Sequence, residues 1–212
     1  MNAATRRAPP DDVMTKVLLA SKSPRRQALL RQLGVDFAVL DVDVPEVPRP
    51  GQSPIEYAVS VAAAKARAGA IRAGTESVVL GADTDVSIDG EILGKPPNPE
   101  HAAQMLLRLS AREHQVCSAV AIVHGGELRT ALSVTTVEFG PISEAAAIAY
   151  AETGEPLGKA GAYAIQGYAA RWIRSINGSY SGVVGLPLFE TAALLDALTL
   201  TTQPPTTPPN SP

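Results

Sequence analysis

The segment Ser-Lys-Ser-Pro-Arg-Arg at residues 21–26 combines a helix start with two adjacent cations. Ser23 occupies a typical N-cap position and Pro24 the first helical position. Arg25 and Arg26 then fall in the first turn, where the helix macrodipole disfavours positive charge. Backbone N–H groups at a helix start bind anions, and arginine binds phosphate oxygens in pairs. The segment therefore predicts an anion-binding site, with a solvated arginine pair as the alternative.

A candidate catalytic carboxylate follows an apolar run. Residues 77–83 read Ser-Val-Val-Leu-Gly-Ala-Asp, which predicts a buried strand that ends at Asp83. Active sites of α/β proteins usually lie at such strand ends. A carboxylate in that place can act as a general base, although an ordinary turn carboxylate is the alternative.

Two lysines and one amide complete the set of candidate binding residues. Lys65 falls on a long predicted helix, and Lys95 lies in the rigid turn Leu-Gly-Lys-Pro-Pro-Asn-Pro-Glu. Gln166 ends a long glycine-rich loop at residues 155–167, and loops of this length are usually functional. Its amide can both donate and accept hydrogen bonds, as reading a nucleobase requires. Together these side chains suit a small molecule that carries several phosphates.

The elements that must position these residues alternate between strands and helices. Strands are expected at 16–21, 37–42, 77–83, 114–123, 130–139 and 171–176, and helices at 24–33, 54–73, 99–109, from about 143, and at 187–198. Asp89-Gly90 and Gly125-Gly126 predict tight hairpin turns, so the strands that they join run antiparallel. We therefore expect an α/β fold with a mixed central sheet flanked by helices.

The helix at 54–73 is expected to bury one apolar stripe. Apolar residues recur there at steps of three to five, as in an amphipathic helix. The expected stripe consists of Ile55, Val59, Ala62, Ala63, Ala66 and Ile71.

Composition excludes several classes of protein. The 212 residues carry a net charge of −3, which argues against a nucleic-acid-binding protein with a basic face. The longest apolar run, residues 116–123, is too short to cross a membrane, and no segment resembles a signal peptide. Cys117 is the only cysteine, so the chain has no internal disulfide or multi-thiolate metal site, and it fits a reducing cytoplasm.

The two ends of the chain differ from its middle. Residues 1–15 are polar without periodicity, and residues 201–212 are rich in proline and threonine. Neither composition builds a core, so we expect both ends to be disordered. Residues 16–200 contain no convincing linker and are expected to form one domain.

Three long segments together resemble one known family. They read LLASKSPRRQALLRQLGVDF, GADTDVSIDGEILGKPPNPEHAAQMLLRLS and GEPLGKAGAYAIQGYAARWIRSINGSYSGVVGLPL. In this order, over residues 16–198, the chain resembles the Maf-like nucleoside triphosphate pyrophosphatases. The resemblance implies a cytoplasmic enzyme with an elongated mixed α/β fold and a central nucleotide-binding cleft. It implies hydrolysis of a nucleoside triphosphate to the monophosphate and pyrophosphate, a divalent metal such as Mg²⁺ or Mn²⁺, and a homodimer.

The resemblance also assigns site residues position by position. Asp83 matches the family's proton acceptor. The positions that bind the triphosphate are matched by Ser21, Arg25, Arg26, Lys65 and Lys95. The positions that distinguish the subgroup cleaving dTTP and UTP are matched by Arg25, Thr84 and Gln166. The subgroup acting on 7-methyl-GTP departs from the motifs GADT and AYAIQG, both of which this chain keeps, so dTTP and UTP are the expected substrates.

Two other readings stay open at this point. One is a Maf-like pyrophosphatase of shifted specificity, toward 7-methyl-GTP or other modified nucleotides, whereas modified pyrimidine nucleotides would still fit the dTTP and UTP reading. The other is a non-catalytic nucleotide-binding regulator of cell division, which would need neither Asp83 nor a metal.

The chain departs from the family pattern at two places. Asp85 replaces a residue that is usually apolar. If the strand continues past Asp83, both carboxylates share one face. Asp85 could then raise the pKa of Asp83 or recruit a metal, or it could lie at a twist without a role. In the segment Asp-Val-Pro-Glu at 43–46, Pro45 replaces an acid while Glu46 keeps the terminal carboxylate, so no metal role is assigned there.

Overall fold

One mixed sheet runs along the molecule in the computed structural model, which describes residues 16–198. We expected residues 1–15 and 201–212 to be disordered and the domain to end at residue 200. These positions lie outside the described residues. The strands are β1 (Val17–Leu19), β2 (Phe37–Val39), β3 (Val78–Ile88), β4 (Glu91–Ile92), β5 (Glu113–His124), β6 (Glu127–Phe139) and β7 (Ile173–Asn177). The α-helices are α1 (Pro24–Gln32), α2 (Pro54–Ala73), α3 (Pro99–Leu109), α4 (Glu144–Glu152), α5 (Tyr180–Val184) and α6 (Leu188–Asp196), with 3₁₀ turns at Ala160–Ala162 and Tyr168–Trp172.

Strand β3 joins a parallel and an antiparallel half of the sheet. The strand order is β2-β1-β3-β5-β6-β7, and β4 pairs with β3. β1 pairs in parallel with β2 and β3, whereas β5, β6 and β7 follow as antiparallel strands. The expected α/β fold with a mixed, helix-flanked sheet is thus confirmed.

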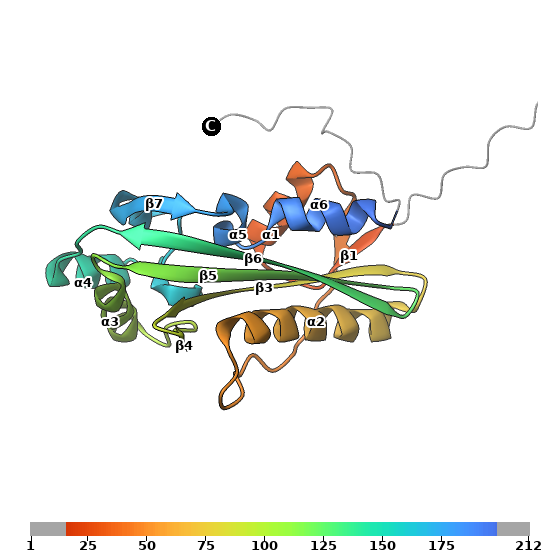
Figure 1. The fold of residues 1–212 in the computed structure, drawn as a ribbon, viewed down its shortest axis with the longest axis horizontal. Coiled ribbons are helices and arrows are strands. Elements are labelled where there is room, and N and C mark those ends of the chain that lie inside the picture. The colour runs from red at the N-terminus through yellow and green to blue at the C-terminus, as the bar shows by residue number, and fades with distance from the viewer. Residues whose placement is uncertain (1–15, 199–212) are drawn as a thin grey trace, which may run out of the picture.

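The helices cover the sheet from both sides and give an elongated shape (Figure 1). Helix α2 lies along one face, and α1, α5 and α6 lie on the other. Small residues fill the α2 interface, where Ala62 and Ala66 belong to one buried cluster with Cys117 and Ala119 of β5. Helices α3 and α4 pack at one end of the sheet, where most of the buried aromatic residues gather.

Helix starts follow the expected capping residues. Ser23, Ser53, Asn98 and Ser143 each accept a hydrogen bond from a backbone N–H in the first turn of the helix that follows. At α2 the cap is a full capping box, in which Glu56 also bonds back to Ser53. These local signals explain why the predicted bounds of α2 and α3 agree with the structure.

The predicted buried stripe of α2 is partly wrong. Ile55 is 43% exposed and Ile71 is 86% exposed, whereas Lys65 is only 8% exposed. Helix α2 approaches the sheet so closely that a Cβ on Gly81 would lie 2.4 Å from the carbonyl oxygen of Ala62. Only small side chains fit at this close contact, so Ala62 and Ala66 occupy it, whereas Ile55 and Ile71 point toward solvent.

Strand β3 is longer than expected, and Asp83 lies inside it. The strand continues to Ile88 and turns at Asp89-Gly90, where both residues have positive φ, as a tight hairpin requires. Pairing with β5 holds this second half in place, which the apolar pattern did not indicate. β1 pairs with β3 only as far as Leu80, so Asp83 still lies just beyond the end of the parallel half.

Candidate active site

A pocket with a volume of about 250 Å³ opens between the two halves of the fold. It is lined by the start of α1, by α2 and β3, by the Lys95 turn and by the glycine-rich loop. Of the eight residues predicted for the site, seven line this pocket: Arg25, Arg26, Lys65, Asp83, Thr84, Lys95 and Gln166. Ser21 does not, but its hydroxyl accepts hydrogen bonds from the Ser23 backbone N–H and from the Arg26 guanidinium, and so fixes the helix start.

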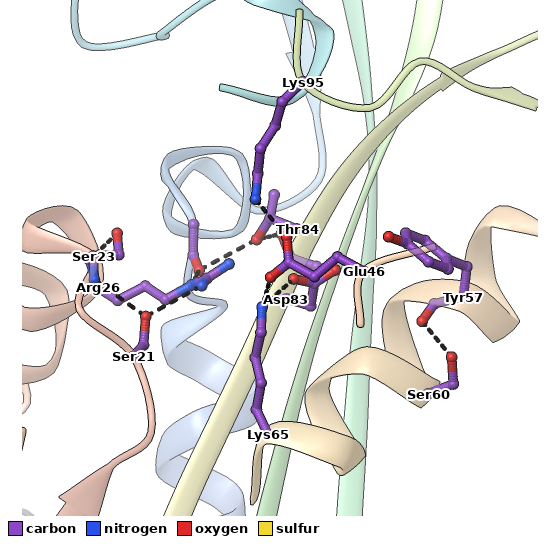
Figure 2. A network of polar contacts seen from close by, with 12 residues as sticks. Ser21, Ser23, Arg26, Glu46, Tyr57, Ser60, Lys65, Asp83, Thr84 and Lys95 are labelled. Carbon is purple, nitrogen blue, oxygen red and sulfur yellow. Dashed lines mark hydrogen bonds and ion pairs between the residues drawn. The ribbon is translucent and has the colours of Figure 1, made fainter. Parts of the chain in front are cut away.

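Two lysines and two carboxylates form a continuous chain of ion pairs in the pocket (Figure 2). Lys65 Nζ lies 2.7 Å from Asp83 Oδ1 and 2.6 Å from Glu46 Oε1. Lys95 Nζ lies 2.5 Å from Glu46 Oε2. Lys65 and Asp83 are both buried, so their charges attract each other with little screening by solvent. The pair fixes the position of the Asp83 carboxyl group.

Glu46 belongs to the site although it was not among the predicted site residues. It comes from the segment between β2 and α2, and it bridges Lys65 and Lys95. Partial burial tends to raise the pKa of Glu46, but hydrogen bonds and charge from both lysines outweigh this effect and lower the pKa to about 2. The retained acid at the end of Asp-Val-Pro-Glu was the signal that could have identified it.

The two arginines at the start of α1 point toward the carboxyl end of another helix. Arg26 Nε donates to the carbonyl oxygen of Gly185 at 2.9 Å, and Arg25 Nε donates to that of Val184 at 3.2 Å. These carbonyls end α5, where the helix dipole favours cations. Burial lowers the pKa of Arg26, whereas the negative charge of Asp83 opposes that shift. The hydrogen bonds to Val184 and Gly185 therefore offset the unfavourable position of two cations at the start of α1.

Thr84 lies on the opposite face of β3 from Asp83. Its hydroxyl lies 2.9 Å from that of Ser118 on β5 and donates to the carbonyl oxygen of Gly185 at 3.2 Å. Gly185 thus accepts hydrogen bonds from both Thr84 and Arg26. The arrangement ties β3 to the end of α5 beside the pocket.

The glycine-rich loop brings Gln166 to the rim of the pocket, where its side chain is exposed. Buried Tyr163 anchors the loop, with its hydroxyl 2.8 Å from His114 Nε2 on β5. Burial lowers the pKa of His114 to about 4, so the imidazole is neutral at pH 7. Gly161 has φ +67° and leaves no room for a side chain, since a Cβ there would lie 2.8 Å from Val86. Both anchors fix the loop that carries Gln166.

The second acid of β3 is buried beside the first. Because β3 is continuous, Asp83 and Asp85 point to the same face, as the sequence predicted for a strand that continues past Asp83. Asp85 is 7% exposed, and its Oδ2 has no hydrogen-bond partner among the described residues. Burial, reinforced by the charge of Asp83, raises the pKa of Asp85 to about 8.

The described residues do not form a metal site by themselves. No cluster of three or more histidine, cysteine or acidic side chains within residues 16–198 has the geometry to hold a metal ion. The two acids that line the pocket, Glu46 and Asp83, are already engaged by Lys65. In the same described range, no helix has the length and apolar character needed to cross a bilayer.

Comparison with known proteins places this chain in a family. The family model described as "Maf-like protein" matches residues 16–198, which are all the residues described above. The chain belongs to the Maf-like family. The expected resemblance is thereby confirmed.

Curated Maf-like relatives are similar over nearly their full length. A protein of Burkholderia lata named dTTP/UTP pyrophosphatase is 50% identical over 200 residues, covering 89% of this chain and 95% of the relative. Proteins of the same name from Aromatoleum aromaticum and Escherichia coli O157:H7 are 45% and 49% identical and cover 87% and 86% of this chain. Among solved structures, a nucleoside-triphosphatase (dITP/XTP pyrophosphatase) of Mycobacterium abscessus overlaps with a TM-score of 0.47 at 19% identity, over 87% of this chain and 94% of that one.

Proposed function

We propose that this chain hydrolyses dTTP and UTP to the nucleoside monophosphate and pyrophosphate. The names of its curated relatives, at 45% to 50% identity, support this activity. The observation that carries the proposal is the buried pair of Lys65 and Asp83 at the base of a pocket lined by further cations. A pocket of this kind suits a polyanion that must be attacked by water.

Asp83 is the general base of the proposed reaction. It accepts a proton from the water that attacks the α-phosphorus in line with the departing pyrophosphate. Lys65 holds this carboxyl group in place, because its Nζ lies 2.7 Å from Asp83 Oδ1. A water between Asp83 and the bound nucleotide would then have an acceptor on one side and the phosphorus on the other.

The cations of the pocket stabilise the negative charge that builds on the leaving group. Arg25 and Arg26 approach from α1, and Lys65 and Lys95 approach from α2 and the Pro-rich turn. Donors that are already in place before the reaction stabilise a developing charge without further reorganisation. Glu46 holds both lysines while the pocket is empty of nucleotide, and the triphosphate oxygens replace it as their partner.

Base selection is proposed for Thr84 and Gln166. Both line the same pocket as the phosphate-binding cations, and Gln166 is held at its rim by the anchored glycine-rich loop. A planar amide that donates and accepts hydrogen bonds can pair with the polar edge of thymine or uracil.

The metal, the oligomer and the compartment are further parts of the proposal. Mg²⁺ is commonly held by one or two carboxylates together with substrate phosphates, so Mg²⁺ or Mn²⁺ would enter with the triphosphate. We further propose that the chain acts as a homodimer in the cytoplasm. Light scattering coupled to size-exclusion chromatography tests the oligomer, and chelation with EDTA followed by return of Mg²⁺ or Mn²⁺ tests the metal.

The decisive experiment measures pyrophosphate release from a panel of nucleoside triphosphates that includes 7-methyl-GTP and modified pyrimidines. The proposal expects the highest kcat/KM for dTTP and UTP. A preference for 7-methyl-GTP would instead indicate shifted specificity. Nucleotide binding without any hydrolysis would indicate the regulator.

A further inference from the structure

Asp85 is a buried acid for which the proposed reaction has no use. It lies two residues from Asp83 on the same face of β3, opposite Cys117 of β5. Both side chains are buried, and at positions i and i+2 of a continuous strand they project side by side from the same face. Two ionised carboxylates this close repel strongly in a buried setting, so one of them must hold a proton.

The neighbouring cations decide which carboxyl group is protonated. Lys65 forms ion pairs with Asp83 and Glu46, and none of the ion pairs among the described residues involves Asp85. Asp83 therefore has a cation at 2.7 Å, whereas Asp85 has only the packed interior and an unpartnered Oδ2. A proton on Asp85 would turn this carboxyl group into a donor, and Asp83 is the neighbouring acceptor on the same face of β3.

The other ionisable groups around Asp85 do not compete for this proton near neutral pH. From α2, burial raises the pKa of Tyr57, and Asp85 adds to that shift. From β5, burial raises the pKa of Cys117 to about 11. Glu46 has a pKa lowered to about 2, while the charges of Lys95 and Arg26 favour ionised Asp85 only from a distance.

We propose that Asp85 is a positioning residue that stays protonated at neutral pH and donates a hydrogen bond to Asp83. This inference rests on the proposed function, because it assigns Asp85 a role toward the general base. The bond orients the Asp83 carboxylate toward the pocket and spreads its charge, while Lys65 keeps it ionised. Loss of the proton at higher pH would place a second negative charge beside the base and repel the triphosphate.

Carboxyl protonation can be measured directly, without activity. In the full-length chain with ¹³C-labelled aspartate, the Cγ signal that Asp85→Asn removes is followed by NMR against pH. The proposal expects this signal to titrate near pH 8, as the raised pKa of about 8 implies. A midpoint near the ordinary value of 3.8 would overturn it.

The pH dependence of stability gives a second readout of whether Asp85 carries the proton. A carboxyl group whose pKa is higher in the folded chain stabilises it fully at pH values below the unfolded pKa and loses this contribution as pH rises to the folded pKa. The free energy of unfolding of the wild type should fall between pH 4 and 8 relative to Asp85→Asn. Parallel curves for the two proteins would contradict the proposal.

Two variants separate positioning from packing in the reaction itself. Asp85→Asn keeps a donor that cannot ionise, so its kcat should stay near that of the wild type at pH 7. In the wild type, kcat/KM should decline above pH 8 as Asp85 loses its proton. In Asp85→Asn this decline should be absent. Asp85→Leu removes the donor and should lower kcat about tenfold without loss of stability, because an apolar side chain suits this interior.

The outcomes for Asp85 and for Asp83 are distinguishable. An Asp85→Leu enzyme with unchanged kcat and the wild-type pH profile would overturn the positioning role. Activity that survives Asp83→Asn would instead refute the assignment of the base, while the NMR titration would still decide whether Asp85 carries the proton.

Discussion

Lys65 and Asp83 form a buried ion pair, 2.7 Å between Nζ and Oδ1, that joins helix α2 to strand β3 across the sheet interface. The lysine lies on the face of α2 that packs on the sheet, where Ala62 and Ala66 are also buried. A charged pair in such surroundings is costly to maintain unless both partners are present. This relationship allows the stability and the activity of the chain to be tested separately.

Asp83→Asn should remove the general base and leave the shape of the side chain unchanged. We expect kcat for dTTP to fall by about 10² or more, the scale that general-base catalysis contributes. Pyrophosphate release measures it. Asp89→Asn is the matched control, because Asp89 forms an exposed pair with Arg112 at the β3–β4 turn. Near-normal turnover of Asp83→Asn would refute the assignment.

Lys65→Met should destabilise the fold because it leaves Asp83 buried without its cation. Breaking a buried pair costs about 3 kcal/mol, which should appear as a lower free energy of unfolding in urea. Lys16→Met is the control, since Lys16 pairs with Asp36 at the surface. If the two variants lose similar stability, the Lys65 pair is less desolvated than its burial indicates.

Gln166→Glu should change the choice of nucleotide more than the rate of the reaction. An acid cannot donate where the amide did, so kcat/KM for dTTP and UTP should fall about tenfold or more relative to other triphosphates. The measurement is the ratio of kcat/KM values across the panel. Gln104→Glu, on the exposed side of α3, controls for the added charge. An equal loss for every nucleotide would argue against a base-reading role.

The ion pairs of Glu46 should lose their contribution to the free energy of unfolding at low pH. Partial burial opposes the shift, but hydrogen bonds from Lys65 and Lys95 lower the pKa of Glu46 to about 2 from an ordinary value of 4.5. Its contribution is therefore complete above about pH 4.5 and is lost as pH falls toward 2. Glu46→Gln should unfold with a smaller pH dependence in that interval, measured by thermal denaturation. Glu127→Gln, at an exposed pair, should behave like the wild type.

Gly81→Ala should force α2 away from the sheet. The added methyl group would lie 2.4 Å from the oxygen of Ala62, 2.6 Å from the nitrogen of Ala66 and 3.1 Å from Lys65 Cβ. Because two of these neighbours are backbone atoms, we expect a loss of about 2 kcal/mol or more and a lower kcat/KM through the displaced lysine. Gly140→Ala, whose nearest neighbouring atom is 3.6 Å away, is the control. If Gly81→Ala were as stable as the wild type, α2 would be able to move away from β3 at little cost in free energy.

Local signals in the sequence were enough to predict most helices and both hairpins. Ser53 with Glu56 begins α2, and Asp89-Gly90 adopts the positive φ angles that a two-residue turn requires. Such features depend on neighbours in the chain alone. An anion-binding site at Arg25 and Arg26 could likewise be predicted, because the helix macrodipole disfavours two cations in the first turn of a helix.

Tertiary contacts decided what the local pattern could not. The burial of Lys65 depends on how closely α2 approaches Gly81, and no periodicity of α2 encodes that distance. The continuation of β3 beyond Asp83 depends on pairing with β5. Glu46 joins the site through lysines 19 and 49 positions away along the chain, in a segment without regular structure. Lys65 could be listed as a candidate cation from the sequence, but only the resemblance to a family matched it to a triphosphate-binding position.

The hydrogen bonds from Arg25 and Arg26 to the end of α5 connect residues 159 positions apart. Synthesis proceeds from the N-terminus, so both arginines leave the ribosome long before Val184 and Gly185 do. A nascent chain that holds Lys65, Asp83 and Lys95 still lacks the carbonyls that orient its arginines. The completed pocket therefore arises only near the end of translation, and partial chains are not expected to consume nucleotides.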